Sequence, residues 1–293
     1  MAYKITRRQM VRLTAATAIS VGLPMGAWSG IENLDADKGM NIMMITGPEN
    51  QIATYSVGEA GVMPIVFLHG DSARASQWNP VMQVLGTGYS FDFSGHGASE
   101  PHGAGDYSFA ARAADLQAVV AAYELERFVI VAHSGSVGTA LEYAGAHGDQ
   151  VAGVMLVDPA TDPRQMPAEI RDGFMAAIAG PDGAEAVKGY YASIGGSNRE
   201  VIAQIQADAD VVDPDARLGF AQALINWNPE VALAGYSGPL EILITPANDN
   251  PAAIHHFTKI TPTMVPDTGH WVHLDAPEVV ADAVKGFILT LNN

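Results

Sequence analysis

The stretch FVIVAHSGSV, residues 128–137, decides the fold that the sequence predicts. Its first five residues are apolar, as in a strand buried on both faces of a parallel sheet. Apolar side chains then recur at helical spacing from Val137 to Ala144. Ser134 lies at this strand-to-helix junction, with the small residues Ala132 and Ser136 two positions away on either side. This is the pattern of a nucleophile elbow, a tight turn that exposes a reactive hydroxyl at a helix N-terminus.

Three more apolar runs predict buried strands at residues 64–68, 154–157 and 240–244. Helical patterns alternate with them, and we expect two weaker strands within residues 41–57 to form an antiparallel pair at the sheet edge. This alternation predicts an α/β fold with a mostly parallel central sheet flanked by helices. Residues 161–229 break the alternation, since they hold helical patterns and no strand run. They therefore predict a helical insertion between two strands of the sheet.

A serine nucleophile needs a base to take its proton and an acid to orient that base. His270 lies in a Gly-containing loop just before the final helix and is the candidate base. Asp249, shortly after the strand at 240–244, is the first choice for the acid. Asp158, directly after the strand at 154–157, is the alternative, although an aspartate there can also cap the insertion. Ser136 fits the small-x-Ser-x-small pattern as well and is a rival nucleophile.

Four segments in this order resemble the α/β-hydrolase fold superfamily in its single-domain, capped branch: residues 67–71, 92–99, 132–136 and 268–271. The order Ser134, Asp249, His270 is also the order of that superfamily. The resemblance covers roughly residues 50–290. It implies a hydrolase core formed by residues 30–160 and 230–293, with residues 161–229 as a helical cap inserted before the penultimate strands.

The resemblance also implies an oxyanion hole, formed by the backbone N–H groups of Asp71 and Gly135. Asp71 departs from the pattern of the superfamily because its carboxylate would place negative charge beside this hole and oppose the transition state. Ser94 likewise stands where an arginine is frequent in this branch. Neither departure removes the serine, histidine and aspartate set.

The expected activity is that of a cofactor-free serine hydrolase, which cleaves carboxylic esters or lactones through an acyl-enzyme on Ser134. Acidic residues outnumber basic ones in 161–229, which disfavours an anionic substrate and favours a small, neutral, largely apolar one. Carbon–carbon bond hydrolysis and cofactor-free perhydrolysis on the same triad stay open, as does a ligand-binding receptor with slow turnover. The candidate substrate contacts are His69, His133, Phe174, Tyr190 and Trp227. Aromatic residues at helical spacing can equally form a core.

We expect no metal and no cofactor. His255 and His256 suggest metal ligands, but adjacent side chains diverge on a helix and no third ligand is evident in the sequence. The chain has 293 residues with no cysteine, 15 Lys and Arg against 32 Asp and Glu, and a formal net charge of −17. The absence of cysteine excludes disulfides and thiolate metal sites. The negative charge argues against binding to nucleic acids, which requires a basic surface.

The first 29 residues have the order of an export signal. Basic residues come first, followed by a mildly apolar stretch from Leu13 to Leu23 that is too short to span a membrane. Ala27-Trp28-Ser29 then offers a site for cleavage. Residues 6–12, TRRQMVR, resemble the twin-arginine consensus. We therefore expect recognition by the export machinery, a periplasmic or secreted protein and no stable membrane anchor, with an ordinary basic N-terminal helix as the alternative.

Overall fold

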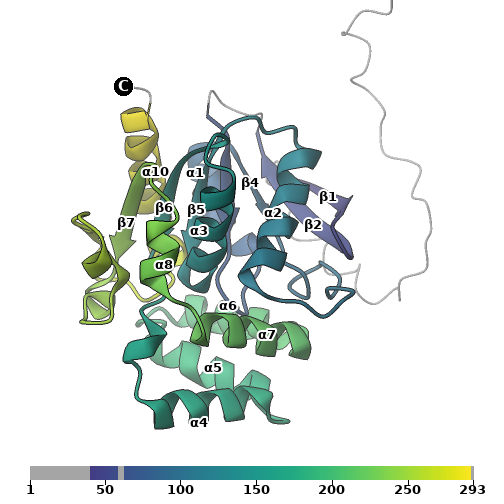
Figure 1. Cartoon of the computed structure of the whole chain (residues 1–293), viewed down its shortest axis with the longest axis vertical. Coiled ribbons are helices and arrows are strands. Elements are labelled where there is room, and N and C mark those ends of the chain that lie inside the picture. Colours follow the sequence, from purple (N-terminus) through teal and green to yellow (C-terminus); the bar gives the residue numbers. More distant parts are fainter. Residues whose placement is uncertain (1–39, 59–62, 292–293) are drawn as a thin grey trace, which may run out of the picture. The chain divides into compact units, whose positions relative to one another are not determined.

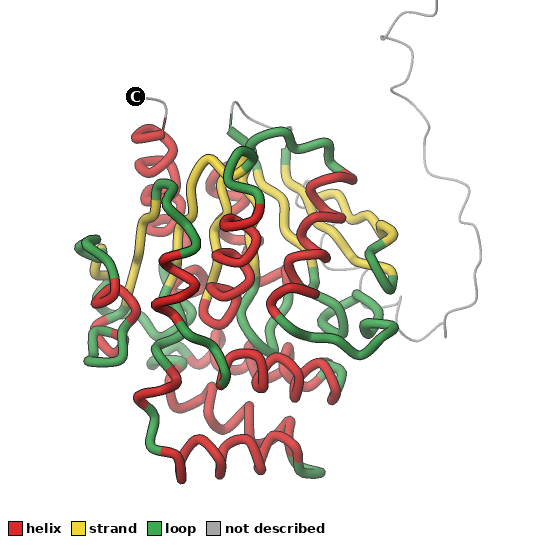
Figure 2. The backbone as a smooth tube through the Cα atoms, in the orientation of Figure 1, coloured by secondary structure: helices red, strands yellow, loops and turns green. Residues whose placement is uncertain are grey.

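The computed structural model describes residues 40–58 and 63–291, which are built around an eight-stranded sheet (Figures 1 and 2). The strands lie in the order β1-β2-β4-β3-β5-β6-β7-β8. The β1–β2 and β2–β4 pairs are antiparallel, and all other neighbours are parallel. The strands are β1 (Met40–Thr46), β2 (Gln51–Val57), β3 (Ile65–Leu68), β4 (Gly88–Phe91), β5 (Phe128–His133), β6 (Val151–Val157), β7 (Leu240–Ile244) and β8 (Thr263–Met264). The expected α/β fold and the antiparallel pair at the edge are confirmed.

Helices cover both faces of the sheet, as Figure 1 shows. One face is covered by α2 (Phe109–Ala122), α3 (Val137–Ala146) and α8 (Pro229–Ala234). The opposite face is covered by α1 (Asn79–Leu85), α9 (Val272–Asp275) and α10 (Pro277–Leu291). Every residue of β5 and β6 is buried as a result, which explains why their sequences are continuously apolar instead of alternating.

Four further helices lie between β6 and β7 in the sequence and together form one layer in Figure 1. They are α4 (Ala168–Ala179), α5 (Gly183–Ile194), α6 (Arg199–Asp210) and α7 (Pro214–Ile225). Asn198 and Asp213 cap α6 and α7 through their side-chain oxygens. The layer has its own apolar cluster, which includes Val187 and Ile205 and extends to Trp271 in the loop after β8. Its packing therefore reaches the segment that carries His270.

The structure adds elements that the sequence patterns did not predict. Strand β4 has only four residues, begins with a glycine at φ 148°, and contains no continuous apolar run. The carboxylate of Asp275, just before the last helix, accepts a hydrogen bond from the Gly269 N–H at 2.8 Å. It therefore orders the loop before His270.

No helix within residues 40–58 and 63–291 is both long and apolar enough to cross a membrane. The expected export signal, residues 1–29, lies outside the described residues.

Candidate active site

Ser134 occupies the turn between β5 and α3 in a left-handed backbone conformation, with φ 52°. This conformation is uncommon for a residue with a side chain and is found where a nucleophile is presented on a strained turn. Ser136, the rival nucleophile, is fully buried. Its hydroxyl is within hydrogen-bond distance of two backbone carbonyl oxygens, that of His133 at 2.7 Å and that of Leu68 at 3.2 Å. Ser136 therefore supports the turn, while Ser134 is only partly buried and lines a pocket.

His270 lies in the loop between β8 and α9, with Nε2 2.8 Å from Ser134 Oγ and Nδ1 2.6 Å from Asp158 Oδ2. A carboxylate can only accept, so Nδ1 carries the proton and Nε2 accepts the hydrogen bond of the Ser134 hydroxyl. The backbone N–H of His270 donates to the carbonyl of Ile194, at the end of α5, at 3.0 Å. The inserted helices thus help to hold the imidazole against Ser134.

Asp158 is the residue immediately after β6, and its side chain is only 2% exposed. Its second oxygen, Oδ1, accepts the Thr245 N–H at 2.7 Å. Burial alone would raise the pKa of Asp158. The hydrogen bond from His270, the charge of His270 and the hydrogen bond from the Thr245 N–H together outweigh burial, so the pKa of Asp158 is lowered. The carboxylate is therefore held ionised behind His270, as a catalytic triad requires.

Asp249, the first choice for the acid, does not contact His270, and that prediction is wrong. Its side chain is 49% exposed, and its Oδ1 lies 3.4 Å from His255 Nε2. Strand β7 ends at Ile244, and a short helical turn over Pro246–Asn248 separates it from Asp249. Asp158, in contrast, directly follows the last residue of β6. The alternative acid is the one that the structure places at His270.

Asp71 and Gly135 are neighbours beside Ser134. A Cβ on Gly135 would lie 2.6 Å from both carboxylate oxygens of Asp71, so a larger residue there would displace the Asp71 side chain. The Tyr191 hydroxyl of α5 donates to the Asp71 carbonyl and ties this segment to the inserted helices. This arrangement supports the expected oxyanion hole, and the donor role of the two N–H groups stays a prediction. The Asp71 side chain also lines the pocket that contains Ser134.

The pocket above Ser134 has a volume of about 590 Å³ and is closed on one side by the inserted helices. Phe174 and Tyr190 line it, as expected. Trp227 does not, because it is buried edge-to-face against Phe109. His69 and His133 are also absent from the lining. They are fully buried, with His69 Nε2 accepting the Phe93 N–H at 3.0 Å and His133 Nε2 donating to the His270 carbonyl at 2.9 Å. Direct substrate contact is therefore wrong for these three residues.

Two buried histidines, His133 and His273, lie close to His270. The rings of His133 and His273 are 4.5 Å apart, and His273 stacks on Trp78 at 4.2 Å. Burial lowers the pKa of His133 to about 3 and places the pKa of His273 well below its ordinary value. Neither ring nitrogen of His273 has a hydrogen-bond partner among the residues that the structure describes. Both histidines are therefore neutral in the folded protein.

Replacing His273 with phenylalanine is expected to weaken the acid sensitivity of folding. A histidine that stays neutral when buried favours folding above its unfolded pKa of about 6.5, and this advantage is lost as pH falls because the unfolded chain takes up the proton. Between pH 7.5 and 5.0, His273→Phe should lose about 2 kcal/mol less free energy of unfolding than the parent. Urea unfolding at the two pH values measures this. The exposed His256→Gln variant should match the parent, and an equal loss in His273→Phe would contradict the assignment.

Asp249, His255 and His256 form a group whose potential ligand atoms all lie within 4.8 Å of one another. The sequence argument that the paired histidines lack a third candidate ligand is therefore wrong, since folding supplies Asp249. Asp249 and His256 are exposed, and none of the three lines the pocket of Ser134. The group could hold a cation at the surface, but it has no geometric link to the triad.

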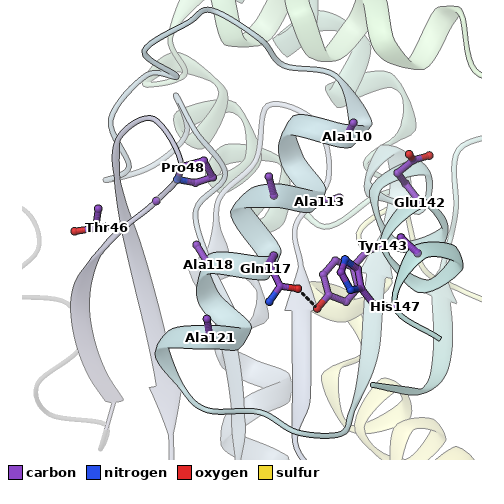
Figure 3. A pocket seen from close by; sticks show the side chains of 13 residues that line it. Thr46, Pro48, Ala110, Ala113, Gln117, Ala118, Ala121, Glu142, Tyr143 and His147 are labelled. Carbon is purple, nitrogen blue, oxygen red and sulfur yellow. Dashed lines mark hydrogen bonds between the residues drawn. The ribbon is translucent and has the colours of Figure 1, made fainter. Parts of the chain in front are cut away.

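A separate groove of about 580 Å³ lies between α2, α3 and the β1–β2 turn (Figure 3). Five alanines of α2 form one wall, and the Tyr143 hydroxyl donates to Gln117 at 2.8 Å. Glu142 and His147 lie at its α3 side (Figure 3). None of Ser134, Asp158 and His270 lines this groove.

Comparison with known proteins gives relatives of the same fold. The model of the Alpha/beta hydrolase family matches residues 65–283. A Non-heme chloroperoxidase of Streptomyces lividans is 33% identical over 130 residues, which are 40% of this chain and 47% of that protein. The match thus spans about half the length of that curated relative.

Among solved structures, a thermophilic esterase from Thermogutta terrifontis superposes with a TM-score of 0.73 at 19% identity, covering 86% of this chain and 100% of the other. The enol-lactonase from Burkholderia xenovorans LB400 gives a TM-score of 0.73 at 16% identity, covering 84% of this chain and 100% of the other. These likenesses show the fold.

Proposed function

The chain belongs to the Alpha/beta hydrolase family, and on that basis we propose that it is a serine hydrolase that cleaves carboxylic esters or lactones through an acyl-enzyme on Ser134. The observation that carries the proposal is the continuous hydrogen-bonded series from Ser134 Oγ through His270 to Asp158, with distances of 2.8 and 2.6 Å. Such a series activates a hydroxyl for attack on a carbonyl carbon.

The reaction proceeds in two halves. His270 Nε2 takes the proton as Ser134 Oγ attacks the carbonyl carbon, and Asp158 stabilises the imidazolium that results. The negative charge on the carbonyl oxygen is received by the N–H groups of Asp71 and Gly135. His270 then protonates the leaving alkoxide, and the acyl group stays on Ser134. Water then attacks the acyl-enzyme as His270 takes its proton, the bond between the acyl carbon and Ser134 Oγ breaks, and His270 returns the proton to Ser134 as the acid leaves.

The pocket favours a small, neutral and largely apolar substrate. Side chains from the inserted helices, including Ile170, Phe174 and Leu224, form much of its wall, and burial of apolar substrate surface against them favours binding. Esters and lactones are preferred over amides because an alkoxide leaves with less protonation than an amide nitrogen requires.

The enzyme should hydrolyse short 4-nitrophenyl esters faster than long ones, and γ-lactones with measurable turnover. The assay is a series of 4-nitrophenyl esters of two to sixteen carbons, together with γ-butyrolactone followed by acid release. Esters of two to six carbons should give the highest kcat/KM because the pocket is closed by the inserted helices. Absence of turnover with all of them, from folded protein, would contradict the proposal. A single stoichiometric burst without further turnover would instead indicate a receptor that turns over slowly.

A second candidate, perhydrolysis, is favoured by the similarity to a protein described as a Non-heme chloroperoxidase. Hydrogen peroxide would then replace water in the attack on the acyl-enzyme and release a peracid. The same assays with hydrogen peroxide distinguish the two, because peracid formation should exceed hydrolysis only if perhydrolysis is the function.

A further inference from the structure

Asp71 carries a partly buried carboxylate that the proposed reaction does not use. Its side chain is 16% exposed and lines the same pocket as Ser134 and His270. The carboxylate lies against Gly135, the residue that follows the nucleophile. Its Oδ1 atom is buried and lies 3.6 Å from Arg112 Nη1, so a ligand in the pocket meets the other oxygen, Oδ2. A carboxylate in the wall of a largely apolar pocket is a strong acceptor for a hydrogen-bond donor on a ligand.

Arg112 lies behind this carboxylate. It comes from α2, its side chain is 1% exposed, and its Nη1 is 3.6 Å from Asp71 Oδ1. Its guanidinium group packs over the rings of Phe109 and Phe220, at 4.6 and 3.7 Å from their centroids. It does not line the pocket, so a substrate reaches Asp71 without touching Arg112.

The charge of Arg112 bears on the ionisation of Asp71. Burial raises the pKa of Asp71, while the positive charge of Arg112 and, more weakly, that of His270 oppose the rise. Tyr190 and Tyr191 of α5 also face Asp71, and neither carries a positive charge. Among the groups facing Asp71, Arg112 is therefore the fixed charge that keeps the carboxylate available as an acceptor.

We propose that the Asp71 carboxylate is a specificity-determining group that accepts a hydrogen bond from the acyl part of the substrate, so that the preferred substrates are esters or lactones with a hydroxyl or N–H within two carbons of the scissile carbonyl. The proposal rests on the function proposed above. The acyl carbon bonds to Ser134 and stays there through both halves of the reaction, so its nearest substituents lie beside Gly135 and Asp71. Arg112 is a positioning residue that acts through Asp71.

The same geometry explains discrimination against plain esters. An unsubstituted acyl chain offers the Asp71 carboxylate no donor and leaves its negative charge beside the developing oxyanion. A hydroxyl or N–H donor satisfies the carboxylate and reduces that opposition. A site built to receive a hydrogen bond rejects the analogue that lacks it far more strongly than an apolar pocket rejects an extra methylene.

The test compares kcat/KM for methyl 2-hydroxybutanoate and methyl 3-hydroxybutanoate, each enantiomer separately, with that for methyl butanoate. The preference, defined as the ratio of hydroxy ester to plain ester, is measured in the parent and in Asp71→Leu/Arg112→Met. Comparing preferences between proteins cancels the intrinsic reactivity of the esters. The double variant replaces the charge pair with apolar groups of similar size, a change that buried pairs often tolerate. For at least one hydroxy ester, the preference of the double variant should be at least tenfold lower than that of the parent.

Controls keep the result interpretable. Asp71→Asn has nearly the same shape but a neutral acceptor, and its preference should be at least threefold lower than that of the parent, even if the double variant does not fold. The exposed Asp249→Asn should keep the parent preference. Equal preferences, within twofold, in the parent and Asp71→Asn would overturn the inference while leaving the serine hydrolase intact. No hydrolysis of any ester by the folded parent would overturn both.

Arg112 has its own readout, the pH dependence of the preference. If Arg112 keeps Asp71 ionised, Arg112→Met should shift the midpoint at which the preference sets in upward by at least one pH unit. Titration of His270 affects both esters alike and cancels in the ratio. A merely structural role of Arg112 would change the rates without moving this midpoint, and that result would contradict the positioning role.

Discussion

Replacement of Ser134 by alanine is expected to lower kcat/KM for a short 4-nitrophenyl ester by about 10⁴- to 10⁶-fold. The alanine variant lacks the nucleophile, so only binding and oxyanion stabilisation remain to accelerate attack by water. Alanine has the same Cβ as serine and a smaller side chain, so it adds no new strain to the backbone at φ 52°, and the fold should persist. Initial rates at substrate concentrations below KM, with the melting temperature as a check on folding, measure the effect.

Ser136→Ala is the matched control, because Ser136 is two residues away and its hydroxyl bonds to backbone carbonyls of Leu68 and His133. Its loss should lower kcat/KM by no more than about fivefold, through stability and positioning of the turn. If Ser136→Ala abolished activity while Ser134→Ala retained it, the assignment of the nucleophile would be wrong.

Asp158→Asn is expected to lower kcat/KM by about 10⁴-fold, while Asp249→Asn changes it by less than about twofold. An amide at position 158 no longer provides a negative charge for the imidazolium, and its N–H group favours the tautomer of His270 that cannot accept the Ser134 proton. Asp249 is half-exposed and does not reach His270. The two substitutions are chemically identical, so the comparison isolates position.

The same ester assay, run across pH 5–9, measures this pair. The loss in Asp158→Asn should persist at every pH, since it does not arise from a titration that pH could reverse. Substantial activity in Asp158→Asn combined with inactivity of Asp249→Asn would restore the acid first chosen from the sequence.

Sequence patterns predicted most of the sheet because short continuous apolar runs such as 128–132 and 154–157 are typical of strands buried on both faces. They also identified Ser134 and His270, whose neighbours in the sequence constrain the backbone. The acid was harder to choose. Asp158 and Asp249 both come after strands that lie side by side, β6 and β7, and only the tertiary path decides which carboxylate reaches His270.

Other features depend on contacts between distant segments and leave no local signal. Strand β4 is short and alternates small and aromatic residues, so it has no continuous apolar run. It forms through its pairing with β2 and β3. The pairing of Asp71 with Arg112 joins the loop after β3 to α2, across 41 positions of sequence. Trp227 was expected in the pocket because it is aromatic, but residue type alone does not distinguish a pocket wall from a core contact with Phe109.

If Ser134 is a nucleophile activated by His270 and Asp158, it should react covalently with an electrophile that mimics a carbonyl. Folded protein is incubated with a fluorophosphonate, its mass is measured intact, and the modified residue is located by peptide mapping. We expect one adduct per chain, on Ser134, that forms much more slowly in Asp158→Asn and at the parent rate in Asp249→Asn. No adduct on folded protein, or an adduct located at a residue other than Ser134, would contradict it.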